Sequence, residues 1–411
     1  MVRRNNHTWD LLGAIPRRSD LAKVVKEVTV RAYTWEDREY VSEMGCLIDA
    51  LEVLPNVFFP EDTEVNTHDD AIIRLIDTKA PAITRLSVSG EVLWTCQSLS
   101  SFRALQELEL IYTNTFNGLG EILVHCATLT SLTILPTECA YLGQLFTALE
   151  AHPGALSNLS AFKYLAPSED SCMVTVERVI SLCKFLKNKR CLRRLDVKFD
   201  GNDGVERPLL ELLPELPALA VLGFSFVRGA RWMPEDIIPF ERAIPAHVSA
   251  LRLEHFLDRG MGVVDDGLDP YTSCREAWLK LFKSRMSLRY LHIVEFPTRA
   301  TDTDLELDSG NRGLTFHRLT AEDLPSSLEL FGNRADIHPI IRAASAPNGA
   351  SASRSKFGPC WSLEKIAFRT VEDFGCADWE WLFRWHDFNS LDFFRTGVLQ
   401  HGVYGQWAMS G

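Results

Sequence analysis

The sequence holds 10 cysteines but no Cys-x-x-Cys pair, and it has no recognisable signal peptide. Its N-terminus carries basic residues without the apolar core of roughly 7–15 residues that such a peptide needs. Several cysteines lie within apolar runs, where a reduced thiol packs as a small hydrophobic group. These absences argue against a disulfide framework and predict an intracellular protein, cytoplasmic or nuclear, whose thiols are free.

Long apolar runs and an excess of basic charge are also missing. In the first half of the chain, the longest segment without Asp, Glu, Lys or Arg is 122–137, shorter than the roughly 20 apolar residues that a membrane-spanning helix needs. Acidic residues outnumber basic ones by 55 to 43, which gives a net charge of −12. Negative charge disfavours non-specific binding to nucleic acid. We therefore expect neither a membrane nor a nucleic-acid partner.

Sequence patterns that carry chemistry are absent as well. The chain contains no Gly-x-Ser-x-Gly, no phosphate-binding Gly-x-x-x-x-Gly-Lys-Ser/Thr loop and no His-Glu-x-x-His zinc motif. Asp302, Asp304 and Glu306 alternate as in a calcium loop, but Leu307 stands where that loop requires glycine. The sequence thus predicts a protein that is not an enzyme, with no catalytic, cofactor-binding or metal-binding residues.

The sequence does contain a recurring phrase, in which an apolar residue is followed by two others, an apolar residue, one other and an apolar residue. Clear copies lie at 105–110, 129–134, 192–197, 219–224, 248–253 and 288–293. Weaker copies lie at 25–30, 54–59, 83–88, 159–164, 363–368 and 388–393, and a degenerate copy is centred on Leu328. The copies recur at intervals of about 30 residues. Each copy predicts a short strand, because alternate side chains of a strand point to opposite faces.

Segments with helical periodicity lie between the phrases, at 69–80, 118–126, 171–190 and 273–285. In the third of them, the predicted buried face consists of Val176, Val179, Ile180, Cys183 and Leu186. One strand and one helix cannot bury their apolar faces alone, so the units are expected to stack. The prediction is an α/β solenoid with short parallel strands on a concave face and helices on a convex face.

At this point the phrase resembles the strand of leucine-rich repeats, over roughly residues 20–395. The irregular spacing and the opening LLGAIPRRSDLAKVVKEVTVRAY at 11–33 are similar to the divergent repeats that follow the F-box in large fungal families. Where the family usually has an Asn or Cys after the phrase, this chain has Thr113, Thr137, Asp200, Val227 and Phe296. The F-box motif itself is not found, because only about 20 residues precede the first strand.

The resemblance implies a non-catalytic, protein-binding, curved horseshoe. More specifically, it implies the substrate-recognition subunit of a cullin–RING ubiquitin ligase. The alternative is a scaffold or regulatory interaction module unrelated to ubiquitin. The Skp adaptor is expected as a partner only if an F-box precedes this chain, and no cofactor is expected.

The predicted domain organisation is an N-terminal helical stub at 1–22, a solenoid at 23–395 and a tail at 396–411. Flexible insertions are expected at about 299–313, which is polar and acidic, and at 343–357, which is rich in Ala, Ser, Pro and Gly. A tryptophan-rich helix containing Trp381, Leu382 and Trp385 is expected to cap the open core, with a partner groove as the alternative.

Side chains that alternate with the core positions are expected to face the concave side. They carry mixed charge, which suits selective recognition of a protein; the alternative is that they are merely solvated sheet positions. The predicted protein-binding residues are Glu107, Glu109, Arg194, Asp196, Lys198, Arg252, Glu254, Tyr290, His292, Lys365 and Arg369.

Overall fold

The computed structural model groups the chain into two compact units, residues 1–192 (unit 1) and residues 193–411 (unit 2). The residues that it describes are 28–29, 56–58, 83–89, 97–113, 116–136, 142–166, 174–199, 204–228, 234–257, 270–295, 320–333, 336–342, 355–361 and 374–386. The predicted end segments 1–22 and 396–411, the acidic segment 299–313 and the predicted phrases at 363–368 and 388–393 lie outside these residues.

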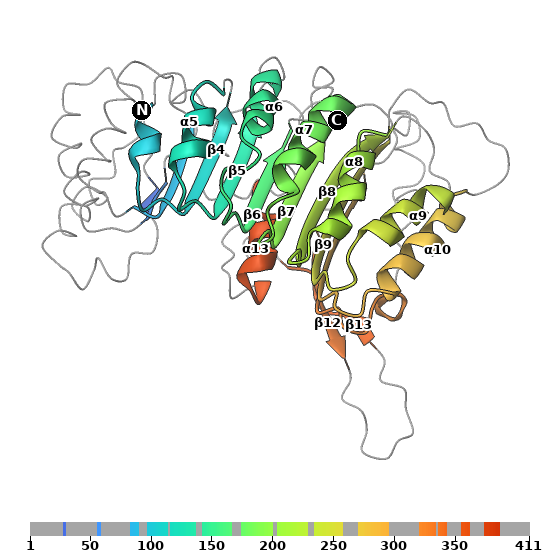
Figure 1. Cartoon of the computed structure of the whole chain (residues 1–411). Helices are drawn as coiled ribbons and strands as arrows, with labels where there is room; N and C mark the ends of the chain where they lie inside the picture. The colour runs from blue at the N-terminus through green and yellow to red at the C-terminus, as the bar shows by residue number, and fades with distance from the viewer. Residues whose placement is uncertain are drawn as a thin grey trace, which may run out of the picture. The chain divides into compact units, whose positions relative to one another are not determined.

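Unit 1 contains strands that pair in parallel, each with the next along the chain. They are β1 (Val28–Thr29), β2 (Asn56–Phe58), β3 (Arg85–Ser89), β4 (Glu107–Thr113), β5 (Ser131–Pro136) and β6 (Ala161–Leu165). The connecting helices are η3 (Gln97–Ser101), α5 (Leu119–His125), α6 (Leu142–Ala151) and α7 (Val176–Leu186). The last three are labelled in Figure 1. The pairing register aligns the central residues of successive phrases, so that Leu108 lies opposite both Leu86 and Leu132.

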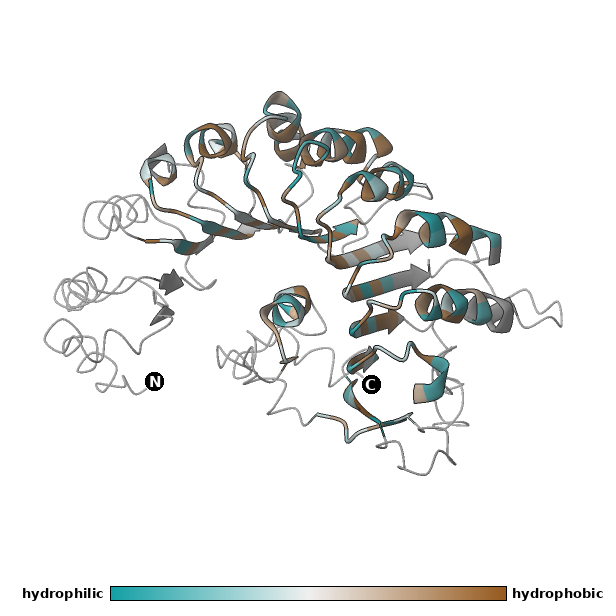
Figure 2. Cartoon of the chain, turned by 60° about the horizontal axis from the view of Figure 1, so that its bottom comes forward, coloured by the Kyte–Doolittle hydropathy of each residue, from teal (hydrophilic) through white to brown (hydrophobic). Residues whose placement is uncertain are grey.

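Unit 2 continues the same pattern. Its parallel strands are β7 (Arg194–Phe199), β8 (Val221–Arg228), β9 (Ala250–Leu257), β10 (Tyr290–Glu295) and β11 (Leu330–Asn333). Its connecting helices are α8 (Arg207–Leu212), η4 (Leu213–Glu215), α9 (Pro234–Ala243), α10 (Pro270–Lys283) and η5 (Ala321–Asp323). Figure 2 shows the connecting helices of each unit on one side of its strands. The leucine-rich-repeat fold predicted from the phrase is thereby confirmed.

All strands were predicted to be parallel and to lie within the phrases. Two strands do neither. β12 (Asp336–Arg342) pairs antiparallel with β11, and β13 (Ser355–Phe357) pairs antiparallel with β12. β13 occupies the end of the predicted insertion at 343–357, whose other residues are outside the described ranges. In DIHPIIR the apolar residues alternate over only a short stretch, and a proline interrupts them. The sequence pattern was therefore too weak to predict this strand.

The apolar residues of each phrase form the core between strands and helices. Leu105, Leu108 and Leu110 are fully buried in unit 1, and Leu219 and Leu222 are fully buried in unit 2. Each phrase therefore contributes one layer to a core that grows by stacking. Among the described residues, no helix is long and apolar enough to cross a membrane.

The predicted buried face of 171–190 was partly wrong. In α7, Val176 and Ile180 are 38% and 39% exposed, while Leu182 and Phe185 are buried. Phe185 packs against Phe162 of β6, with ring centroids 6.1 Å apart. Apolar residues lie around more than half of this helix, so periodicity alone did not define its face. Burying Phe185, the largest of these side chains, removes the most apolar surface from water.

A ladder of hydroxyl groups links some neighbouring repeats at the start of the phrase. Where the second residue of a phrase is Thr130, Ser160 or Ser249, its hydroxyl donates a hydrogen bond to the backbone carbonyl at the equivalent position of the preceding repeat. The distances are 3.1 Å from Thr130 to Gln106, 3.0 Å from Ser160 to Thr130 and 3.2 Å from Ser249 to Ala220. These short side chains satisfy carbonyl groups where each strand begins.

The third residue before a phrase also reaches back to the preceding repeat. Lys189 donates from Nζ to the carbonyls of Pro153 (2.9 Å) and Ala155. Arg285 donates from Nη2 to the carbonyl of Glu241 in the same manner. Both cations are buried, at 1% and 8% exposure, and burial lowers the pKa of Lys189 to about 8. Their main role is to hold the loop of one repeat against the next.

Candidate functional site

The predicted binding residues of unit 2 lie on the sheet face opposite the repeat helices, here called the inner face. The register places Asp196, Gly223, Arg252, His292 and Gly332 in one row across β7–β11. The alternation of side chains was thus interpreted correctly. The expectation that these side chains form an exposed surface was wrong, because Asp196, Arg252 and His292 are all 0% exposed.

The inner face is covered by the C-terminal helix α13 (Ala377–Phe383), which contacts β7, β8 and β9. This segment was predicted to cap the open end of the core. Instead, it lies across the strands. The predicted apolar face also shifts. Trp379, Leu382 and Phe383 are buried, Trp381 is partly buried, and the helix ends before Trp385.

The N-terminal turn of α13 is held by two arginines at the start of β7. Asp378 accepts a hydrogen bond from Nε of Arg194 at 2.8 Å and another from Nη2 of Arg193. The carboxylate lies in the first turn, where it also interacts favourably with the helix dipole. Arg194 lies over the ring of Trp381, with 5.8 Å from Cζ to the ring centroid. Ion pairs between Asp378 and the two arginines therefore hold the N-terminal end of α13 against β7.

The middle of α13 rests on an aromatic floor. Trp379 stacks on Tyr290 of β10, with 5.6 Å between ring centroids and 22° between ring planes. Phe383 stacks on His292 at 5.5 Å and 23°. The buried cluster consists of Val221, Ala250, Tyr290, Leu330, Ile337, Trp361, Phe374, Trp379, Leu382 and Phe383. Aromatic residues dominate the energetics of such contacts because each buries a large apolar area.

Gly223 makes the close approach of α13 to β8 sterically feasible. A Cβ atom at this position would lie 2.9 Å from Cδ1 of Leu382 and would overlap Oδ1 of Asp196. The missing side chain therefore leaves room for both groups. In sequence, a glycine inside a strand phrase is a weak sign of close packing by another segment.

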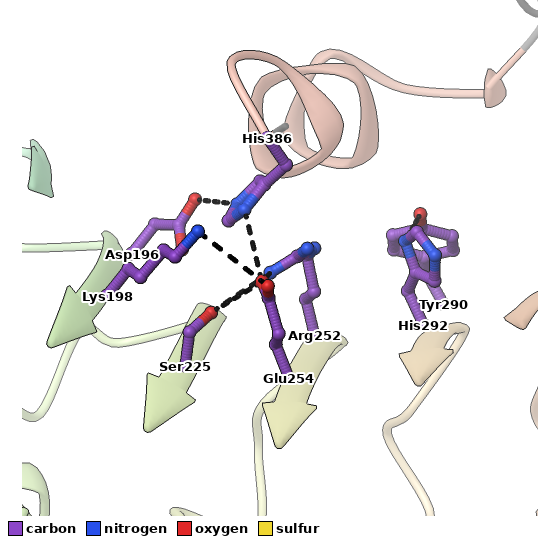
Figure 3. Close-up of polar contacts among 8 residues, drawn as sticks. All are labelled: Asp196, Lys198, Ser225, Arg252, Glu254, Tyr290, His292 and His386. Carbon is purple, nitrogen blue, oxygen red and sulfur yellow. Dashed lines mark hydrogen bonds and ion pairs between the residues drawn. The ribbon is translucent and has the colours of Figure 1, made fainter. Parts of the chain in front are cut away.

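A buried polar cluster lies beside this apolar contact (Figure 3). Oε2 of Glu254 is 2.7 Å from Nη1 of Arg252, and it accepts a hydrogen bond of 2.9 Å from Ser225. Nζ of Lys198 is 3.8 Å from the other carboxylate oxygen. Burial by itself would raise the pKa of Glu254, but attraction to Arg252, Lys198 and His386 holds that pKa well below its ordinary value.

His386 closes this cluster from the segment that follows α13. Its Nε2 is 2.8 Å from Oδ2 of Asp196, and its Nδ1 is 3.7 Å from Oε2 of Glu254. The imidazole is 1% exposed. The cluster therefore joins β7 and β9 to the C-terminal segment, and its charges face one another. No group of three His, Cys, Asp or Glu suited to a metal ion occurs in the described part of the chain.

The other predicted residues lie elsewhere. Glu107 forms a partly exposed ion pair with Arg85, at 2.6 Å, while Glu109 is 8% exposed, and both belong to unit 1. Lys365 and Arg369 are outside the described residues. Sequence reasoning missed Asp378, Trp379, Phe383 and His386 as contacts of the inner face. The only signal for them was the density of tryptophan near residue 380.

Comparisons with known proteins give a distant structural likeness. No protein-family model matches the chain, and no curated protein matches it. The chain is similar to the solved structure of the leucine-rich repeat-containing protein LegL7 from Legionella pneumophila, with 13% sequence identity and a TM-score of 0.40. The match covers 69% of this chain and 88% of that one. The strand register and the repeat helices, rather than this likeness, identify the fold.

Proposed function

We propose that this chain is a non-catalytic, protein-binding leucine-rich-repeat protein, and that the inner face of β7–β10 is its binding surface. One observation carries the proposal. This face already holds a helix, α13, through charged contacts at one end and aromatic stacking in the middle. An apolar floor with arginines at its edge suits an amphipathic segment of a protein. Among the described residues, the thiols of Cys126, Cys191, Cys360 and Cys376 form no disulfide, which supports an intracellular location.

Site-specific photo-crosslinking of the full chain tests this proposal. A photoreactive amino acid in place of Arg289 would stand at the edge of the inner face, because Arg289 lies over the ring of Trp379 at 5.3 Å. The matched control replaces Ile238, which is 42% exposed on α9 among the repeat helices. We expect specific crosslinked proteins from position 289 alone. The same crosslinked proteins from both positions would contradict the proposal.

The finer role that we propose is substrate recognition in a cullin–RING ubiquitin ligase, with an interaction scaffold as the alternative. Its support is the resemblance of 11–33 and of the irregular repeats to fungal F-box proteins. We expect residues 1–411 not to bind the Skp adaptor in a purified two-component assay, since their sequence shows no recognisable F-box. Tight binding would reveal a divergent F-box in the chain. Ligase subunits among the crosslinked proteins would favour the ligase role over the scaffold.

A further inference from the structure

We propose that α13 occupies, within its own chain, the binding site for a helical segment of a partner protein. The partner segment has the chemistry of α13, with a carboxylate in its first turn followed by large aromatic residues. This inference rests on the proposed function and specifies the partner class for the same surface.

The first argument is the charge at the edge of the site. Arg193 and Arg194 converge on the single carboxylate of Asp378. Arg289, which lies over Trp379, is 50% exposed and pairs with Glu329 at 2.8 Å. Arg193 and Arg194 therefore place positive charge where α13 begins, while Arg289, already paired with Glu329, presents its guanidinium to an aromatic ring. They select a segment that presents negative charge at its N-terminus and aromatic faces beyond it.

The second argument is that α13 can leave without opening the repeat core. The phrase residues Leu195, Leu222 and Leu251 are buried on the other side of the strands, against the repeat helices. α13 itself spans only Ala377–Phe383, and a helix this short is unstable in isolation. Departure of α13 would expose Tyr290 and its apolar neighbours to water, so the vacated face favours a replacement of similar chemistry.

The third argument is an imperfect fit of α13 over Arg252. Arg252 is 0% exposed, and within the described chain its Nε and Nη2 have no hydrogen-bond partner. It lies between Gly223, which meets Leu382, and His292, which stacks on Phe383. Burying donor groups without acceptors disfavours the closed arrangement. A partner segment with an acceptor at the position of Leu382 would satisfy Arg252 and displace α13.

The test uses a labelled peptide with the sequence of residues 374–386 and measures its binding to the full chain by fluorescence anisotropy. Asp378→Arg in the chain repels α13 from Arg193 and Arg194, and Trp379→Glu removes the stack on Tyr290. Glu380→Arg is the control, since it makes the same charge change on the same helix. We expect the peptide to bind both opened variants at least 10-fold more tightly than it binds the wild type or the control.

Two peptide variants test the chemistry of the segment. A peptide with Asp378→Arg should bind none of the chains. A peptide with Leu382→Glu should bind the opened chains at least 10-fold more tightly than one with Leu382→Lys, because only the carboxylate can accept from Arg252. Equal binding of the Glu and Lys peptides would show that Arg252 does not select a hydrogen-bond acceptor. The third argument would then fail, and the proposed partner segment would no longer need an acceptor at this position.

If the opened variants do not fold, hydrogen exchange of backbone amides in the wild-type chain tests the same inference. A saturating amount of unlabelled peptide should speed exchange of the amides at 377–383. Unchanged exchange, equal affinity for all folded chains, or a dimer of the opened variants that excludes the peptide would overturn the inference. The crosslinking experiment distinguishes the two proposals, because partner-specific crosslinks at position 289 without peptide exchange would sustain the proposed function alone.

Discussion

Nε2 of His386 lies 2.8 Å from Oδ2 of Asp196, although 190 positions separate the two residues in the sequence. Both side chains are inaccessible to water, at 1% and 0% exposure. The contact ties the segment after α13 to Asp196, the third residue of β7. Asp196 and its neighbours on the inner face were predicted to form an exposed binding surface, but they are buried while α13 covers them. Substituting them should therefore change the stability of the protein.

Replacing Glu254 by Gln should destabilise unit 2 strongly. The substitution leaves Arg252 buried without its counter-charge, and breaking a buried ion pair from one side costs about 3–5 kcal/mol. Equilibrium unfolding in urea measures the loss. The control is Glu329→Gln, whose pair with Arg289 is about half exposed and should contribute about 0–1 kcal/mol. Equal effects of the two substitutions would mean that Glu254 is solvated.

The stability contributed by Glu254 should depend on pH below its ordinary pKa of 4.5. Because the pKa of Glu254 in the folded protein is held well below that value, the unfolded chain takes up its proton first as pH falls. The contribution is therefore complete at neutral pH and is lost as pH drops below about 4.5. The gap in unfolding free energy between wild type and Glu254→Gln should narrow from pH 7 to pH 3. A constant gap would contradict this assignment.

A single methyl group at Gly223 should loosen α13. It would overlap Asp196 and press on Leu382, and overpacking of this kind costs about 1–3 kcal/mol. Gly154 gives the matched control, since a Cβ there meets nothing within 4 Å. Thermal melting and limited proteolysis near residue 384 should both respond to Gly223→Ala and not to Gly154→Ala. Resistance to the protease equal to that of wild type would show that β8 tolerates the added atom.

The corrected face of α7 can be tested with a pair of substitutions on one helix. Leu182→Ala should cost about 2–5 kcal/mol, because Leu182 is 1% exposed and its removal leaves a cavity. Ile180→Ala should stay within about 1 kcal/mol, because Ile180 is 39% exposed. Chemical denaturation of both variants provides the comparison. The reverse order would restore the face that the periodicity favoured.

The sequence was sufficient for the repeat and its strands, because the phrase is a local pattern. Leu195, Val197 and their equivalents alternate within six residues, so the side of the strand on which they lie is evident without any partner. What covers the other side depends on residues distant in sequence. The contact between Arg194 and Asp378 joins positions 184 apart, and no periodicity in either segment encodes it.

The hydroxyl ladder was missed for a different reason. The Asn or Cys that the family usually carries lies after the phrase, whereas Thr130 and Ser160 act at its second residue. Serine and threonine are common at strand entries and exposed positions alike, so their identity alone did not distinguish a ladder from solvated residues. Their acceptors are backbone carbonyls of the preceding repeat, so only the three-dimensional structure reveals these hydrogen bonds.

The backward hydrogen bonds of Lys189 and Arg285 give the repeat array a direction. In each case the donor belongs to the later repeat and the acceptor to the earlier one, so neighbouring layers are energetically coupled pairwise. A layer that frays deprives the layer after it of carbonyl acceptors for a buried cation, while the layer before it loses only a donor that water replaces readily. Unfolding within a unit should therefore spread more readily toward higher residue numbers than toward lower ones.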